Sequence, residues 1–138
     1  MKRLTRLDEQ NLIEYFRGKK NVILVIIFGS YGTEFQREDS DIDFAILFDG
    51  RLDMIQEMKV LDDLSRILNF ENVDLVNLNK ASVMIQFRSL GGKIIYERDY
   101  YEVCDYMEKV FKLYADFAPK MHAFYKDTLK TAIEISKY

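Results

Sequence analysis

A short apolar strand that runs directly into a glycine and a serine constrains this chain most. Residues 22–28 form a continuous run of β-branched and other apolar side chains, which is typical of a strand buried on both faces. Gly29 and Ser30 end that run, and after ten intervening residues a second strand over 41–48 opens with Asp-Ile-Asp. Two buried strands joined by a polar turn predict a sheet whose edge carries acidic side chains.

The opening of the second strand predicts a metal site. Alternate side chains of a strand share a face, so Asp41 and Asp43 should point to one side while Ile42 points into the core. Two carboxylates a few ångströms apart repel each other unless a cation lies between them. Hard oxygen ligands suit Mg²⁺, which takes its remaining ligands from water and substrate phosphates. We therefore expect a site for a phosphorylated substrate.

The residues before the aspartates fit the binding of phosphate. Gly29 lets the backbone come close to a phosphate, and the amide and hydroxyl of Ser30 can donate hydrogen bonds to it. If a helix begins near Tyr31, its N-terminal dipole adds to that anion site. Ser40 fits a turn or cap position, although its hydroxyl could reach a phosphate. Gly29, Ser30 and Ser40 are therefore the candidate nucleotide-binding residues.

A third acid, Asp74, lies on a later predicted strand over 73–78. Its side chain should point away from Val73 and Leu75, so adjacent strands would place all three acids on one side of the sheet. That geometry serves phosphoryl and nucleotidyl transfer by two metal ions. The alternative is an edge-strand acid that pairs with a nearby lysine.

The rest of the chain alternates helical and extended patterns. Helical spacing predicts a first helix that ends at Gly18, and Pro119 should end or kink the last one. The remaining expected elements are helices over 52–68 and 80–90, a strand over 93–97, and helix from about 99 to the end. The predicted fold class is α/β (α+β), a small mixed β-sheet flanked by helices. We expect a single domain over 1–138, with a core at about 1–98 and a helical tail at about 99–138.

The composition of the chain excludes several classes of function. The formal charge is −3, from 20 basic and 23 acidic residues, and no basic run is longer than Lys19-Lys20. This balance argues against a nucleic-acid substrate. Cys104 is the single cysteine, so no intrachain disulfide forms. The longest apolar run, 22–28, is far shorter than a membrane span, and no secretory segment begins the chain. We expect a soluble, cytoplasmic protein without a membrane partner.

The spacing Gly29-Ser30, ten residues, then Asp41-x-Asp43 resembles the signature of the DNA polymerase β-like nucleotidyltransferases. The compact length is similar to the minimal nucleotidyltransferase (MNT) family, and more narrowly to the MNT antitoxins of HEPN/MNT toxin–antitoxin pairs. The strand around Asp74 resembles the family's third-acid strand, and 92–97 resembles its closing strand. The likeness covers most of the chain from residue 22 onward.

The resemblance implies a polymerase β-like fold and a two-metal site. Asp41, Asp43 and Asp74 would bind two Mg²⁺ ions and carry catalysis, while Gly29 and Ser30 would hold the triphosphate of ATP. It also implies transfer of AMP to a tyrosine of a cognate HEPN ribonuclease toxin, which this chain would neutralise as a partner. In one departure from the family pattern, Glu34 stands where many members have a second glycine.

Two other functions fit the same residues. Tyrosines and phenylalanines are abundant in the predicted helical tail, which favours a protein partner and allows neutralisation by binding alone. Transfer to a small molecule such as an aminoglycoside would use the same acids, although such enzymes usually have a further substrate-binding domain. Arg88 and Lys93 are either within reach of a triphosphate or part of a solvated helix end.

Overall fold

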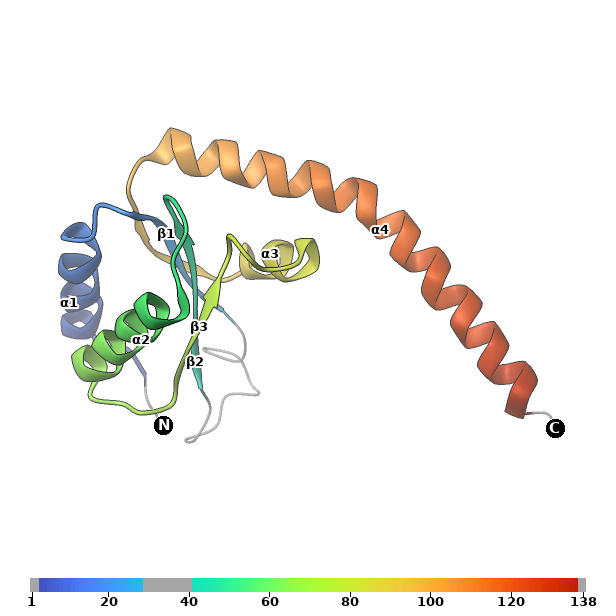
Figure 1. The fold of residues 1–138 in the computed structure, drawn as a ribbon, viewed down its shortest axis with the longest axis horizontal. Coiled ribbons are helices and arrows are strands. Elements are labelled where there is room, and N and C mark those ends of the chain that lie inside the picture. The colour runs from blue at the N-terminus through green and yellow to red at the C-terminus, as the bar shows by residue number, and fades with distance from the viewer. Residues whose placement is uncertain (1–2, 29–40, 137–138) are drawn as a thin grey trace.

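The computed structural model describes residues 3–28 and 41–136, and it confirms the predicted order of helices and strands. Figure 1 shows a small sheet with helices around it and one long helix that leaves the body. The elements are α1 (Arg6–Arg17), β1 (Val22–Phe28), β2 (Ile42–Phe48), α2 (Met54–Leu68), β3 (Val73–Asn77), α3 (Val83–Ser89), β4 (Lys93–Glu97) and α4 (Tyr100–Ser136).

Side-chain caps decide where the helices begin. Before α2, Asp53 accepts a hydrogen bond from the Gln56 amide, and the Gln56 side chain accepts one from the Asp53 amide, which is a capping box. The predicted start at residue 52 is therefore two residues early. Before α3, Ser82 accepts a hydrogen bond from the Ile85 amide, so the predicted start at residue 80 is also early.

The four strands form a sheet in the order β3-β2-β1-β4, and the predicted mixed character of the sheet is confirmed. β1 pairs antiparallel with both β2 and β4, whereas β2 and β3 pair in parallel. The parallel pair is possible because α2 provides the crossover between β2 and β3. The central strands are apolar on both faces because helices cover both sides.

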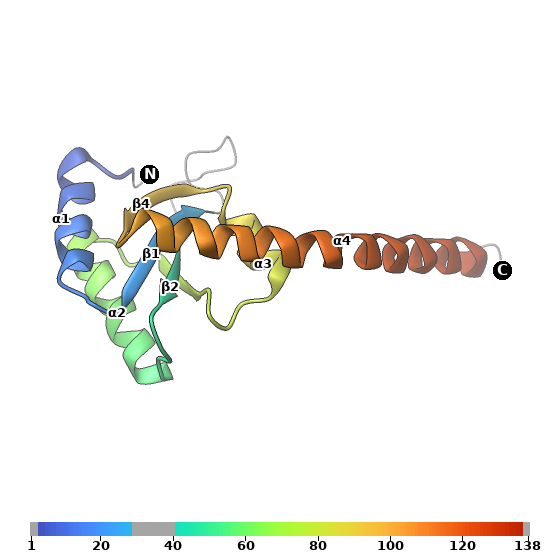
Figure 2. The same cartoon turned by 90° about the horizontal axis from the view of Figure 1, so that it is seen from above.

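One face of the sheet packs against α1 and α2, and the other packs against α3 and the first part of α4 (Figures 1 and 2). The larger core lies under α1 and α2 and includes Phe16, Phe44 and Leu64, all fully buried. The smaller core lies under α4 and includes Leu24 and Val103. Side chains of β2 alternate between these two cores, which fixes the face to which each acid belongs.

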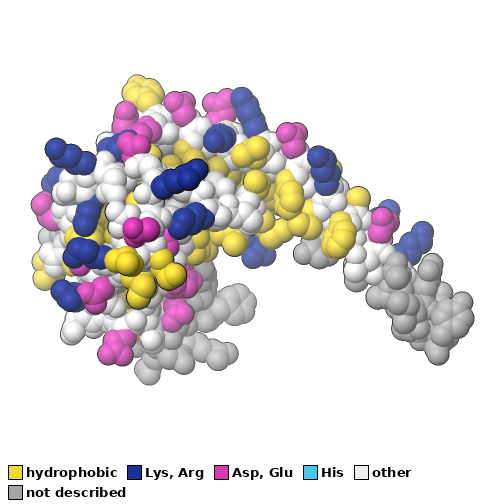
Figure 3. Space-filling model, in the orientation of Figure 1, with side chains coloured by type: hydrophobic (Ala, Val, Ile, Leu, Met, Phe, Trp, Pro, Cys, Tyr) yellow, Lys and Arg dark blue, Asp and Glu magenta, His cyan; other side chains and the backbone are white. Residues whose placement is uncertain are grey.

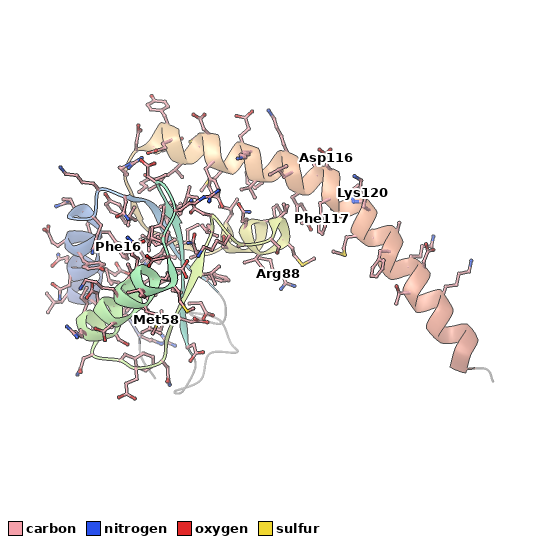
Figure 4. All side chains as sticks on the ribbon, viewed as in Figure 1. Phe16, Met58, Arg88, Asp116, Phe117 and Lys120 are labelled. Atoms are coloured by element: carbon pink, nitrogen blue, oxygen red, sulfur yellow. The ribbon has the colours of Figure 1, made fainter. Side chains whose placement is uncertain are left out.

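The long helix α4 continues through Pro119 and changes direction along its length (Figure 1). The prediction that this proline ends or kinks the helix is thus confirmed as a bend, which Figure 4 places near Lys120. The division of the chain at about residue 99 stays a prediction. Within the described ranges, no helix combines the length and the apolar composition that crossing a membrane requires.

Candidate active site

The candidate acids meet where β1 ends and where β2 and β3 begin. Phe28, the last residue of β1, is the register partner of Asp43, and Asp43 is the register partner of Asp74 on the parallel strand β3. Ile42 and Phe44, the neighbours of Asp43, are buried in the core under α1 and α2. The side chain of Asp43 therefore belongs to the opposite face, the one that α3 and α4 cover.

The three acids influence one another. The pKa of Asp43 is raised above its ordinary value, first by burial and then by the negative charges of Asp74 and Asp41. Asp43 is half-buried, while Asp41 and Asp74 are exposed. One Asp74 oxygen, Oδ1, lies 2.8 Å from the Leu75 amide, which donates a hydrogen bond to it. The site thus combines the partly buried carboxylate of Asp43 with the solvent-exposed carboxylates of Asp41 and Asp74.

The carboxylates of Asp41, Asp43 and Asp74 fit a hard divalent cation only when water and substrate phosphates supply its remaining ligands. The mutual repulsion at Asp43 is the kind that a bound cation relieves, and carboxylate oxygens suit Mg²⁺. Among the described residues, however, no three His, Cys, Asp or Glu side chains are close enough together to hold an ion by themselves. Mg²⁺ binds through one or two carboxylates together with water and substrate phosphates, so this arrangement suits a metal that arrives with a nucleotide.

A close backbone approach fixes the end of β1 beside the acids. At Gly92, a Cβ atom would lie 2.3 Å from the Ile27 carbonyl oxygen and 2.9 Å from the Cβ of Phe28. Only glycine fits there without moving β1. From the sequence, Gly91 and Gly92 predict only the end of a helix, because the β1–β4 pairing that creates this approach is not visible in the local pattern.

Of the other candidate residues, the structure describes Lys93 and Arg88 but not the three proposed nucleotide-binding residues. Gly29, Ser30 and Ser40 lie outside the described residues. Lys93 pairs with Glu9 of α1, on the face of the sheet opposite to the acids, which argues against its contact with a triphosphate there. Arg88 is exposed in the last turn of α3, on the same face of the sheet as the acids (Figure 4).

Comparison with known proteins agrees with this geometry. The family model described as polymerase beta, nucleotidyltransferase matches residues 10–101, which include every strand of the sheet and the three acids. The chain belongs to this nucleotidyltransferase family. A curated relative, the protein adenylyltransferase MntA of Shewanella oneidensis, is 34% identical over 83 residues. This match spans 59% of our nucleotidyltransferase and 59% of MntA.

Solved structures extend the likeness to nearly the whole nucleotidyltransferase. A crystal structure of a toxin–antitoxin with AMP-PNP contains a chain that is 26% identical, with a TM-score of 0.76, and the match covers 89% of this chain and 99% of that one. A structure of the tri-AMPylated Shewanella oneidensis HEPN toxin in complex with MNT antitoxin matches at 25% identity and a TM-score of 0.74. That match covers 91% of this chain and 99% of the other, so it includes much of α4. These likenesses confirm the predicted fold.

Proposed function

We propose that this chain is a Mg²⁺-dependent protein adenylyltransferase that transfers AMP from ATP to a tyrosine of a cognate HEPN toxin and thereby neutralises it. The observation that carries the proposal is the register that places Asp43 beside Asp74, with Asp41 close enough to raise the pKa of Asp43. Relatives named as a protein adenylyltransferase and as antitoxins with AMP-PNP or with an AMPylated toxin support the donor and the acceptor.

The reaction is a substitution at the α-phosphorus of ATP. The tyrosine oxygen forms a bond to the α-phosphorus, the bond from that phosphorus to the bridging oxygen breaks, and pyrophosphate leaves. The phenolic proton is lost, and Asp74 would accept it; its exposure and its register beside Asp43 support this role. Asp41 and Asp43 would hold the two metal ions, and Asp74 would complete the site. When bound, the ions would neutralise the phosphates and lower the pKa of the attacking hydroxyl.

The residues before β2 complete the proposed nucleotide site. Gly29 and Ser30 directly follow β1, whose last residue, Phe28, is paired with Asp43. We propose that they hold the triphosphate through backbone and hydroxyl donors, and that Ser40 adds a further hydroxyl. The close approach at Gly92 supports this arrangement, because it fixes the point at which the chain leaves β1.

Label transfer in a lysate of the source organism tests this function. Purified protein, MgCl₂ and ATP labelled at the α-phosphorus are added, and the Asp41→Ala/Asp43→Ala protein serves as control. A labelled protein band that requires the aspartates, with AMP on a tyrosine by mass spectrometry, is the expected result. Label on a small molecule instead would favour the small-molecule acceptor. Toxin neutralisation that persists in the aspartate variant would favour neutralisation by binding alone.

A further inference from the structure

A small cavity lies between α1 and α2, on the face of the sheet opposite to the acids. Figures 1 and 2 both show these two helices side by side on that face. The hydroxyl of Tyr15 on α1 joins them by donating a hydrogen bond to Asp63 on α2. The cavity has a volume of about 210 Å³ and is bounded by the end of α1, the start of β1 and the first half of α2. None of the three acids lines it.

The floor of the cavity is apolar and closely packed. Phe16, Val22, Leu52 and Val60 line it and belong to the larger core, with exposed fractions of 6% or less. The ring of Tyr15 forms a wall and packs edge-on against Phe16, with ring centroids 5.1 Å apart. A floor held in place by the core offers a ligand an apolar surface that is already formed.

The polar side chains around this floor bring hydrogen-bond donors. They are the ammonium groups of Lys19 and Lys59 and the side-chain amides of Asn21 and Gln56. The side-chain oxygen of Gln56 accepts a hydrogen bond from the Asp53 amide, which leaves its NH₂ group for another partner. Within the part of the chain that the structure describes, the side chain of Asn21 makes no hydrogen bond. The donors suit a ligand that carries acceptor oxygens.

The charge at the cavity is positive, although the chain as a whole carries a formal charge of −3. No carboxylate lines the cavity. Lys19 lies 5.3 Å from the ring centroid of Tyr15 and has no ion-pair partner among the described residues. Asp63 is bonded to Tyr15 at the edge of the cavity, and its other oxygen is 3.9 Å from Lys59, at the outer limit of an ion pair. Asp53 caps α2, where the positive end of the helix dipole offsets its charge.

The size of the cavity limits the ligand to a small molecule. Since liquid water occupies about 30 Å³ per molecule, a volume of about 210 Å³ holds about seven waters, or a ligand of about ten non-hydrogen atoms. Figure 3 shows Lys and Arg side chains mixed with Asp and Glu over α1 and α2, which suits a small anion better than a polyanion such as RNA.

We propose that the cavity between α1 and α2 binds a small organic anion, with a carboxylate or phosphate group on a flat apolar body. The apolar body covers Phe16 and packs against the ring of Tyr15, which favours a planar group. Its anionic oxygens accept hydrogen bonds from Lys19 and Lys59. This second site goes beyond the proposed function and does not depend on it, because it lies on the other face of the sheet.

Titration of the full chain with small probes, followed by NMR of the backbone amides, tests this site. Benzoate and phenyl phosphate carry an anionic group on a flat ring, whereas benzamide is neutral and has nearly the shape of benzoate. Benzoate should bind about tenfold more tightly than benzamide and should shift the amide signals of Lys19, Asn21 and Gln56. Comparison of benzoate with phenyl phosphate then identifies the preferred anionic group.

Variants that remove one charge each supply the second measurement. Lys19→Gln and Lys59→Gln should each weaken benzoate binding about threefold. The double variant should bind benzoate no more tightly than benzamide. Lys20→Gln is the matched control, since Lys20 is exposed next to Lys19 and does not line the cavity, and it should leave binding unchanged.

Three results would overturn the inference. These are equal affinity of the unmodified chain for benzoate and benzamide, unchanged affinity for benzoate in the double lysine variant, and amide shifts confined to the acids at β2 and β3, which would place the anion at the proposed nucleotide site. Benzoate binding should persist in the Asp41→Asn/Asp43→Asn variant, which removes the proposed metal ligands. Failure of this cavity and failure of the nucleotidyltransferase site are therefore separate outcomes.

Discussion

Replacing Gly92 by alanine should destabilise the protein far more than the same change at its neighbour Gly91. The new Cβ would lie 2.3 Å from the Ile27 carbonyl oxygen, about 1 Å closer than the 3.4 Å at which ordinary contacts begin. It would also lie 2.9 Å from Ile26 Cγ2 and from Phe28 Cβ. Two of these three atoms belong to side chains of a central strand that is packed on both sides, and the third is backbone, so none can simply turn away.

The cost follows from this geometry. Overpacking of a dense region costs about 1–3 kcal/mol, and parting β1 from β4 would weaken one ladder hydrogen bond worth about 1 kcal/mol. We expect Gly92→Ala to lower the free energy of unfolding by about 2–4 kcal/mol, or Tm by roughly 10 °C. At Gly91 the nearest atom is the Arg88 carbonyl oxygen at 3.5 Å, an ordinary contact. Gly91→Ala should therefore change stability by less than about 0.5 kcal/mol.

Urea unfolding followed by circular dichroism, with both variants measured against the unmodified chain, supplies these values. Equal stability of the two alanine variants would refute the reasoning, because it would mean that β1 and β4 do not approach each other as closely as the structure shows. A large loss at both positions would instead point to the turn conformation as the cause.

Three further predictions concern single interactions. The raised pKa of Asp43 means that folding favours its protonated form, so without metal the free energy of unfolding should fall as the pH rises through and above about 4. Asp43→Asn should remove part of that fall. Thermal melts from pH 3 to 8 give Tm as a function of pH, and the same pH dependence of Tm in the two proteins would contradict this prediction. Tyr15→Phe removes the hydrogen bond that the Tyr15 hydroxyl donates to Asp63 over 2.7 Å, and should cost about 1 kcal/mol in urea unfolding. Asp53→Ala removes the cap of α2 and should cost about 1 kcal/mol in the same assay, whereas no loss would show that the capping box contributes little.

The candidate site could be predicted from the sequence because its signals are local. A strand of β-branched residues, a Gly-Ser pair and an Asp-x-Asp strand lie within about 30 residues, and period-two alternation alone places Asp41 and Asp43 on one side. The parallel pairing that brings Asp74 into register with Asp43 is not local, so the sequence supported it only as one of two alternatives.

Features that depend on contacts between distant residues could not be predicted. In the sequence Gly92 predicts only the end of a helix, and its close contact with β1 becomes evident only from the β1–β4 pairing. Lys93 likewise fits a phosphate ligand in the sequence, but in the structure it pairs with Glu9 of α1. The sequence predicts that Pro119 either ends or kinks the last helix. The missing backbone donor alone does not decide between these two outcomes. The helical pattern of α4 is visible in the sequence, but the point at which the helix leaves the body is not.

Binding of Mn²⁺ together with a non-hydrolysable ATP analogue tests the central claim most directly, since Mn²⁺ accepts the same oxygen ligands and can be followed by electron paramagnetic resonance. The account predicts that the unmodified chain binds the ion only weakly without nucleotide and tightly with it. Asp43→Asn should reduce that affinity by about tenfold or more, while Asp63→Asn on α2 leaves it unchanged. Nucleotide-dependent binding that is equal in all three proteins would contradict the assignment of the acids at β2 and β3 as the metal site.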